Sequence, residues 1–211
     1  MDARTAQQEE QAWIAQARQG DLAAFAHLVQ AYQRLVYNLT YRMLGNAQDA
    51  EDAAQETFLR AFQHLHTYDP RRKFANWILS IASHHCVDRL RRRRKRWASL
   101  DEMSEQGHSV PSRGESLEEA AMASEAAEEV QRLLERMPPR DRLALILFYW
   151  YEMSHREIAE VTGSSVSAVK SRLHRARLAL ARMLREGRAA GERAPTGGRT
   201  VRPRPREVEG R

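Results

Sequence analysis

The sequence predicts an all-α fold with two small helical domains joined by a flexible acidic linker. Apolar residues recur at three- and four-residue steps in several long segments, and no segment shows the alternation typical of a β-strand. Residues 98–129 hold nine acidic side chains against one arginine, and their first part is rich in Gly, Pro and Ser. Such a composition does not bury a core. We therefore expect a first domain at 1–97, the linker at 98–129, a second domain at 130–186 and a disordered basic tail at 187–211.

Overall charge and cysteine content narrow the class of protein. The chain has 211 residues, a net charge of +6 and a pI near 9.9, which suits a nucleic-acid partner. Cys86 is the only cysteine, so an internal disulfide framework is excluded. The first eleven residues lack the apolar core of a signal peptide, and no segment has the roughly 20 apolar residues that span a bilayer. We expect a cytoplasmic protein without membrane insertion.

Three helices are expected in the first domain. Asp21 is a suitable N-cap for a helix whose apolar residues keep helical spacing until Gly45 and Asn46. Asp49 then opens a second helix, with acids in its first turns and an apolar face made of Ala54, Phe58, Leu59 and Phe62. A basic loop at 68–73 leads into a third helix that starts at Phe74 and continues through Leu90.

The end of the third helix is strongly cationic, since seven of the eight residues from Arg89 to Arg96 are Arg or Lys. Cations are favourable at helix C-termini, so a solvated basic helix end is one interpretation. Contact with a phosphate backbone is the other, and we favour it because such a run repels itself unless an anion lies alongside.

The second domain contains a helix-turn-helix signature at residues 154–177. Helical segments around Leu133 and Leu147, separated by Pro138 and Pro139, precede it. Within the signature, Ala159 allows close helix packing, Gly163 permits the turn, and Ser165 is a plausible N-cap. From there one apolar stripe is expected to form the buried face of a second helix: Val166, Val169, Leu173, Ala176 and Leu180.

The opposite side of that helix carries donors suited to DNA. At about 100° per residue, Ser167, Ser171, His174 and Arg175 face outward, flanked by Lys170 and Arg172. A solvated amphipathic helix would show similar charge, but the small residue, the glycine and the stripe at these offsets favour a helix that reads the major groove.

Metal and enzyme sites are not expected. His84, His85 and Cys86 are consecutive, so their side chains splay apart on a helix, and no second ligand cluster exists for zinc. The sequence has no glycine-rich phosphate loop, no zinc-protease helix and no credible pair of nucleophile and base. We predict no cofactor, no metal and no catalytic residue.

Three sequence blocks together resemble one family. They are residues 49–62 (DAEDAAQETFLRAF), residues 74–82 (FANWILSIA) followed by Asp88 and Arg89, and residues 153–177, which include the helix-turn-helix. In this order, with an acidic spacer, the chain resembles bacterial sigma factors of the extracytoplasmic-function (ECF) group in the sigma-70 family. The resemblance implies a region 2 bundle at 1–97 and a region 4 helix-turn-helix at 130–186. It also implies binding to core RNA polymerase, recognition of promoter DNA and duplex melting, with catalysis left to the polymerase.

The resemblance assigns roles to individual residues. Asp52, Gln55 and Glu56 match the positions that grip core polymerase, although acids are also ordinary near a helix N-terminus. The set expected at the −10 element is Lys73, Asn76, Trp77, Ser80, His84, Arg89, Arg91 and Arg92. The set expected at the −35 element is Ser167, Lys170, Ser171, Arg172, His174 and Arg175.

Some of these assignments have open alternatives. Trp77 suits base stacking and core packing equally. His84 stands where the family usually has Asn, and Ser164 replaces a commonly apolar turn residue. A dimeric helix-turn-helix regulator that binds operator DNA without polymerase is the chief alternative, and a basic RNA-binding or scaffolding protein is a second. An anti-sigma factor is a further partner implied by the resemblance.

Overall fold

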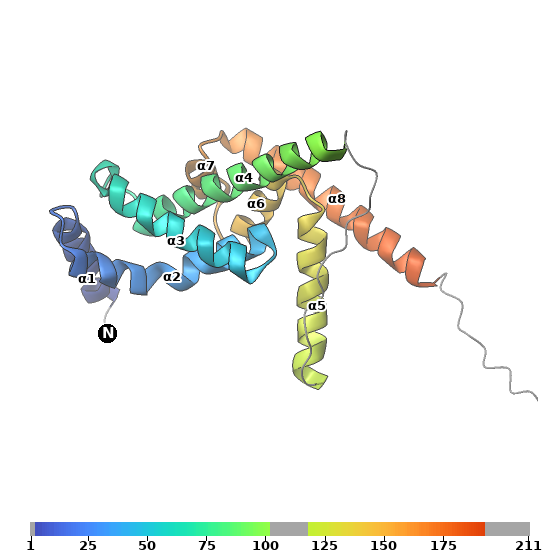
Figure 1. Cartoon of the computed structure of the whole chain (residues 1–211), viewed down its shortest axis with the longest axis horizontal. Coiled ribbons are helices and arrows are strands. Elements are labelled where there is room, and N and C mark those ends of the chain that lie inside the picture. The colour runs from blue at the N-terminus through green and yellow to red at the C-terminus, as the bar shows by residue number, and fades with distance from the viewer. Residues whose placement is uncertain (1–2, 102–117, 193–211) are drawn as a thin grey trace, which may run out of the picture.

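The computed structural model describes residues 3–101 and 118–192, and these form helices joined by short turns, with no strand among them. In chain order the elements are α1 (Ala3–Ala17), α2 (Leu22–Leu44), α3 (Ala47–His64), the 3-10 turn η1 (Leu65–Thr67), α4 (Phe74–Asp101), α5 (Glu118–Glu135), α6 (Pro139–Tyr149), α7 (His155–Thr162) and α8 (Val166–Glu192). We refer to α1–α4 as the first unit and to α5–α8 as the second; α4 contacts α7, and α5 contacts α2. In Figure 1, α5 projects away from the other helices. The all-α prediction is confirmed.

Side-chain caps fix the ends of α2 and the start of α3. The Asp21 carboxylate accepts the backbone N–H groups of Ala23 and Ala24, as predicted for an N-cap. Gly45 ends α2 in the left-handed region with φ 85°. Asn46 caps α3 by accepting the N–H of Asp49 at 2.7 Å, so this helix begins at Ala47, before the predicted Asp49.

Helix α1 was not anticipated from the sequence. Its ordering depends on few apolar side chains: Ile14 and Ala17 are buried, and the Trp13 ring stacks on His27 with centroids 5.0 Å apart. The hydroxyl of Tyr32 on α2 donates to Glu10. Since most other α1 residues are polar, hydrophobic periodicity alone gives a weak signal there.

The buried side of α3 is lined by small residues. Ala50, Ala53 and Ala61 have no exposed surface, which lets α3 approach α2 and α4 closely. The sequence placed Leu59 on the apolar face of this helix, and that prediction is wrong, because Leu59 is 60% exposed. Small alanines hold the interior positions, so the larger leucine is left on the outside.

The helix-turn-helix forms with the predicted chemistry. Ser154 and Glu157 make a reciprocal capping box at the start of α7, and Gly163 takes the left-handed conformation in the turn with φ 59°. The Ser165 hydroxyl accepts the N–H of Ala168 at 3.1 Å. Val169, Leu173 and Ala176 are buried as expected, but Val166, at the first position of α8, is 39% exposed.

The expected linker and tail are partly helical. Residues 118–129, expected to be flexible, form the first part of α5, and α4 continues to Asp101. Glu and Ala dominate residues 118–129, and both are strong helix formers. Helix α8 extends to Glu192, beyond the predicted domain end at 186. Residues 102–117 of the predicted linker and 193–211 of the predicted tail lie outside the described residues.

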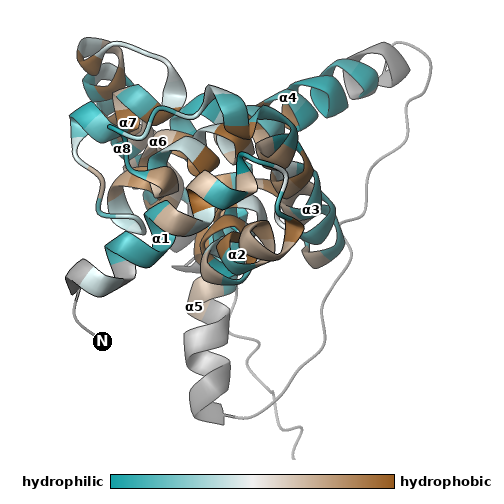
Figure 2. Cartoon of the chain, turned by 90° about the vertical axis from the view of Figure 1, so that its left-hand side faces the viewer, coloured by the Kyte–Doolittle hydropathy of each residue, from teal (hydrophilic) through white to brown (hydrophobic). Residues whose placement is uncertain are grey.

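The two units pack against each other through a shared core. Tyr151 of the second unit donates its hydroxyl to the backbone oxygen of Leu35 at 2.7 Å. The buried guanidinium of Arg142 donates to the backbone oxygen of Met43 on α2. Figure 2 shows apolar residues gathered on the inward faces of the helices and a hydrophilic stretch of α4 that extends beyond them. No helix among the described residues has the length and apolarity needed to cross a membrane.

Candidate nucleic-acid interface

The exposed face of α8 carries five of the six residues predicted for the −35 element. Ser167, Lys170, Ser171, His174 and Arg175 are exposed. Arg175 lies on the surface with its Nη2 3.4 Å from the Asp141 carboxylate of α6. The structure therefore brings these side chains together on one solvent-facing strip of the second helix of the helix-turn-helix.

Arg172 differs from its predicted neighbours because it is partly buried and bound to the turn. Its guanidinium donates to the Ser164 hydroxyl at 3.0 Å, and that hydroxyl also lies 2.5 Å from Thr162 Oγ1. The serine that departs from the family pattern thus supplies a polar partner for Arg172. This arrangement fixes the turn between α7 and α8.

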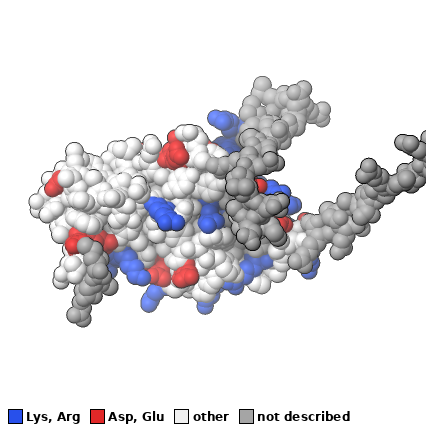
Figure 3. All heavy atoms as spheres, turned by 90° about the horizontal axis from the view of Figure 1, so that it is seen from below, with Lys and Arg blue, Asp and Glu red and all other residues white. Residues whose placement is uncertain are grey.

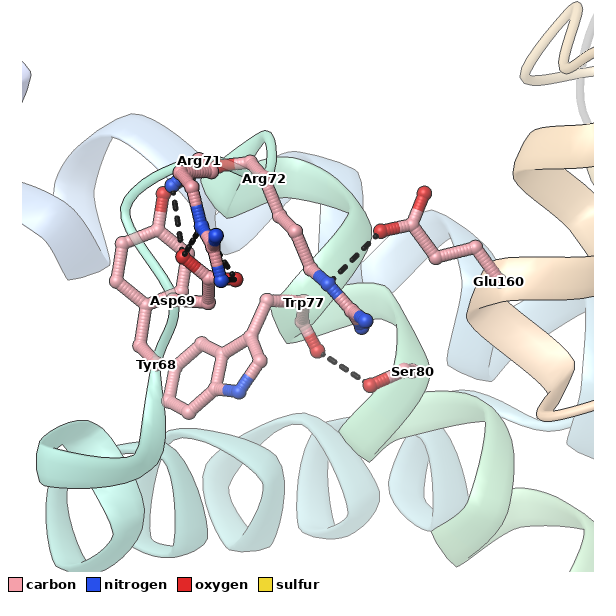
Figure 4. A network of polar contacts seen from close by, with 7 residues as sticks. All are labelled: Tyr68, Asp69, Arg71, Arg72, Trp77, Ser80 and Glu160. Atoms are coloured by element: carbon pink, nitrogen blue, oxygen red, sulfur yellow. Dashed lines mark hydrogen bonds and ion pairs between the residues drawn. The ribbon is translucent and has the colours of Figure 1, made fainter.

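Around the start of α4 lies an aromatic cluster. The half-buried Trp77 ring has its centroid 5.4 Å from those of both Tyr68 and Phe74. Ser80 donates to the Trp77 backbone oxygen at 2.7 Å, as Figure 4 shows. His84 Nδ1 lies 2.6 Å from the Ser80 backbone oxygen. Trp77 therefore has one side in the core and one side at the surface.

The eight residues predicted for the −10 element do not form one surface. At about 100° per residue, Trp77, Ser80, His84 and Arg91 share a face of α4, and exposed Lys73 lies just before the helix. Asn76 is only 6% exposed, so it cannot touch a base in this arrangement. Its position on the helix turns it toward the interior.

Arg89 and Arg92 instead line a groove between α3 and α4. The groove has a volume of about 520 Å³ and is lined by Asp49, Arg60, His85, Asp88, Arg89, Arg92, Arg93 and Arg96. Arg89 pairs with Asp49 and lies 3.8 Å from the Asp52 carboxylate. Burial, followed by the nearby Arg60, lowers the pKa of His85. The run of cations at the end of α4 is thus divided between two faces.

The residues predicted to bind polymerase share one face of α3. Asp52 and Gln55 are exposed, and Glu56 accepts from Arg60 Nε at 2.6 Å. This hydrogen bond holds the pKa of Glu56 below its usual value. Leu59 belongs to the same face by helical spacing, so an exposed apolar side chain lies beside the predicted acidic contact. Its three- and four-residue distances from Glu56 and Gln55 were a signal that the sequence analysis missed.

The basic loop before α4 reaches the second unit. Lys73 Nζ lies 2.8 Å from Glu157 Oε1, and Arg72 Nε lies 3.4 Å from Glu160 Oε1. In Figure 4, Glu160 extends from the helix at the right toward the Arg72 side chain. Hydrogen bonds from Lys73 and then Ser154 lower the pKa of Glu157 to about 2. No sequence signal indicated these contacts, which join residues from two separate motifs.

Charges of both signs are interspersed elsewhere. In Figure 3, Lys and Arg side chains lie beside Asp and Glu on the visible face. Within the described part of the chain, no group of three or more His, Cys, Asp or Glu side chains converges on a metal-sized site. Cys86 is fully buried, and burial raises the pKa of its thiol to about 12.

Comparisons with known proteins show the family of this chain. Residues 28–96 match the family model of sigma-70 region 2, and residues 127–180 match that of sigma-70 region 4. The chain is 36% identical over 178 residues to the ECF RNA polymerase sigma factor SigW of Bacillus subtilis, covering 82% of this chain and 95% of SigW. It is 31% identical to the RNA polymerase sigma-H factor of Pseudomonas aeruginosa, covering 84% of this chain and 95% of that protein.

A solved structure has the same fold. CnrH, in complex with the cytosolic domain of CnrY, superposes with a TM-score of 0.59 and 27% identity, covering 84% of this chain and 98% of CnrH. A helix-turn-helix regulator or a basic scaffold would not match both sigma-70 regions in this order. Nor would it cover nearly the whole length of the sigma-factor relatives. The chain belongs to the ECF group of the sigma-70 family, whose members direct transcription initiation by RNA polymerase.

Proposed function

We propose that three surfaces of this chain divide the work of an ECF sigma factor. The exposed face of α8 reads −35 DNA, the face of α4 around Trp77 engages the −10 element, and the acidic face of α3 docks on core RNA polymerase. The observation that carries the proposal is the exposure pattern of α8. Polar side chains suited to base edges and phosphates face solvent there, while the apolar side chains between them are buried.

At the −35 element, α8 is expected to lie in the major groove. Lys170 and Arg175 supply cations, and Ser171 and His174 supply shorter donors between them. Arg172 has a different role in this proposal, because its bond to Ser164 holds the turn that orients α8.

At the −10 element, Trp77 is proposed to stack on an unpaired base. Stacking on an aromatic side chain contributes about 1–3 kcal/mol per base, which offsets part of the cost of opening the duplex. The ring is held on one side by Tyr68 and Phe74, so it is already oriented before DNA arrives. Lys73, Ser80, His84 and Arg91 lie along the same surface.

On α3, the acidic face offers both charge and an apolar contact. Asp52 and Glu56 suit a basic partner surface, and Leu59 supplies apolar area between polar side chains.

An anti-sigma factor is a further proposed partner. The resemblance to ECF factors suggests one, and CnrH was likewise solved with a partner protein, the cytosolic domain of CnrY. We also propose a cytoplasmic location, since core polymerase and promoter DNA are found there.

The test is transcription in vitro with core polymerase and a randomised promoter library, with sequencing of the RNA 5′ ends and their templates. We expect new start sites that share two upstream elements. Arg175→Ala should relax selection of the upstream element, while Arg182→Ala, an equivalent change elsewhere on α8, should leave it unchanged. No new start site with folded protein and active core polymerase would overturn the proposal.

The docking face is tested separately by co-purification with core polymerase. The charge reversals Asp52→Lys and Glu56→Lys together should abolish retention. Glu128→Lys with Glu129→Lys, two exposed acids on α5, is the matched control. Wild-type retention of the α3 variant would remove the docking assignment and leave the DNA assignments standing.

A further inference from the structure

The groove between α3 and α4 takes no part in the three surfaces proposed above. Its volume of about 520 Å³ lies in the range of small-molecule sites. Five arginines, one histidine and two aspartates line it: Asp49, Arg60, His85, Asp88, Arg89, Arg92, Arg93 and Arg96. The groove therefore combines the size of a ligand site with an excess of positive charge.

Only part of this charge is balanced by carboxylates. Arg89 pairs with Asp49, and Arg60 donates to Glu56 at 2.6 Å. Among the residues that the structure describes, no carboxylate lies within ion-pair distance of Arg92 or Arg93. Like charges held close together repel, so an anion that enters the groove lowers their electrostatic energy.

His85 lies among these cations with an unused ring nitrogen. Its Nε2 atom is buried and has no hydrogen-bond partner in the described part of the chain. Burial and then Arg60 lower the pKa of His85; Glu56 raises it, and Arg89 and Arg92 lower it further. A buried nitrogen without a partner is unfavourable, and an anion beside it would accept a hydrogen bond from its N–H.

The groove is elongated along both helices. Its lining extends from Asp49 to Arg60 on α3 and from His85 to Arg96 on α4. At about 1.5 Å per residue, each wall is roughly 16 Å long. Guanidinium groups bind phosphate oxygens through paired N–H groups, and several of them in a row suit several phosphates better than one.

We propose that this groove binds an anion of two or three linked phosphates, as in a nucleoside triphosphate or a short polyphosphate. Arg60, Arg89 and Arg92 hold the phosphate oxygens, and His85 donates from Nε2. At about 100° per residue, these α4 side chains lie on a different side of the helix from Trp77. The site is therefore additional to the proposed DNA contacts and does not depend on them.

Neighbouring side chains on α4 provide matched variants. Arg92→Ala removes a charge from the groove, and Arg94→Ala removes the same charge from an exposed position outside it. Asp88→Asn should act in the opposite direction, because this exposed carboxylate lines the groove and repels an anion. All three side chains are exposed, so the variants should keep the fold, which circular dichroism checks.

The first measurement is isothermal titration calorimetry of the full chain with sodium tripolyphosphate. We expect one anion bound per chain, with about ten-fold lower affinity in Arg92→Ala, the effect of losing a hydrogen bond to a charged group. In about 0.15 M salt, Arg94→Ala should change the affinity by less than about two-fold, since charges out of contact are largely screened. Asp88→Asn should bind more tightly than wild type.

Titrations with ATP and with orthophosphate identify the source of the anion. Equal affinity for ATP and tripolyphosphate would assign the site to the phosphate chain alone, and tighter binding of ATP would assign it to a nucleotide. Orthophosphate should bind more weakly than either, because it reaches only part of the groove. Equal affinity for orthophosphate and tripolyphosphate would overturn the assignment to linked phosphates.

The second measurement follows the ring resonances of His85 by NMR, identified with His85→Gln. Tripolyphosphate should shift these resonances and raise the pKa of His85, because a nearby anion stabilises the protonated ring. The resonances of His27, which stacks on Trp13, should not move.

Two results would overturn the site. An unchanged His85 signal at saturating tripolyphosphate, or equal losses of affinity in Arg92→Ala and Arg94→Ala, would reduce the binding to attraction by net charge. If single-stranded DNA shifts the His85 resonances and tripolyphosphate does not, the groove holds a nucleic-acid strand and the proposal is wrong.

Discussion

Arg142 is a charged residue placed where two helix ends meet. Its guanidinium donates to the backbone oxygens of Met43, in the last turn of α2, and Glu135, the last residue of α5. The last carbonyls of a helix have no partner within it and carry the negative end of the helix dipole. A buried cation is therefore compensated at this position, although burial lowers its pKa to about 10.

Arg142→Ala should reduce the free energy of unfolding by about 3 kcal/mol, because two buried carbonyls lose a charged donor and a cavity opens. Urea denaturation followed by circular dichroism measures the loss. Arg140→Ala, on the exposed side of α6, should change stability by less than about 0.5 kcal/mol. Equal midpoints for the two variants would show that Arg142 is not a structural link.

The ion pair between Glu157 and Lys73 stabilises the interface between the units only over a limited pH range. The hydrogen bond from Lys73, followed by those from Ser154, lowers the pKa of Glu157 from 4.5 to about 2. The contribution of ionised Glu157 to the stability of the folded chain is therefore present above about pH 4.5. It is lost as the pH falls toward 2. Glu157, followed by the more distant Glu160, raises the pKa of Lys73 above 10.5, so its contribution is present below that value and is lost at higher pH. Arg72 faces Glu160 across the same interface.

Carbon-13 NMR of the Glu157 carboxyl group should show this titration in the acid range. In Lys73→Gln the pKa of Glu157 should rise toward its ordinary value, with Ser154 still lowering it. An unchanged titration in that variant would mean that Lys73 does not contact Glu157 in solution.

Among the elements, α7 is the one most dependent on a single cap. It spans only His155–Thr162, and its first turn is closed by the reciprocal bonds of Ser154 and Glu157. Short helices gain little from propensity, so the cap and the packing of Ile158 and Val161 hold it.

Ser154→Ala should lower the free energy of unfolding by about 1 kcal/mol, whereas Ser154→Gly should cost only a few tenths. Thermal unfolding of both variants beside wild type provides the comparison. If the alanine variant melts no lower than the glycine variant, the capping box does not stabilise the second unit.

Element prediction from sequence succeeded where apolar periodicity was strong and caps were present. Asp21, Gly45 and Gly163 mark their helix ends in the sequence and in the structure alike. It failed for α1, whose packing depends on few apolar residues, and for residues 118–129, where acidic composition suggested disorder while Ala and Glu favoured a helix. Leu59 was misplaced because alanines fill the interior of α3.

At the scale of the whole molecule, the sequence identified the surfaces but not the contacts between them. Periodicity separates the exposed and buried sides of α8, so most of the −35 set could be read from one segment. The pairing of Lys73 with Glu157 joins positions 84 residues apart, and Arg142 reaches Met43 across 99. Local sequence patterns give no information on contacts between residues so far apart in the chain. For the same reason they did not reveal that Arg89 pairs with Asp49.

Substitutions in the two proposed DNA-binding surfaces should cause different defects in transcription. Arg175→Ala should lower initiation mainly on promoters that depend on the −35 element, while Trp77→Ala should reduce strand opening on all promoters. Permanganate reactivity of unpaired thymines measures opening, and RNA yield measures initiation. In the double variant the free-energy losses should add, because the residues share no partner. Indistinguishable defects in the single variants would argue against two separate roles.

The burial of Cys86 has a consequence for how the chain responds to oxidative chemistry. Oxidants and alkylating reagents attack the thiolate, and a thiol with its pKa raised to about 12 in a sealed core offers almost none at neutral pH. The sulfur becomes reactive only when α4 leaves the core. The rate of alkylation of Cys86 therefore reports the rate at which the first unit unfolds. Oxidation of this sulfur by peroxide should be no faster than that opening.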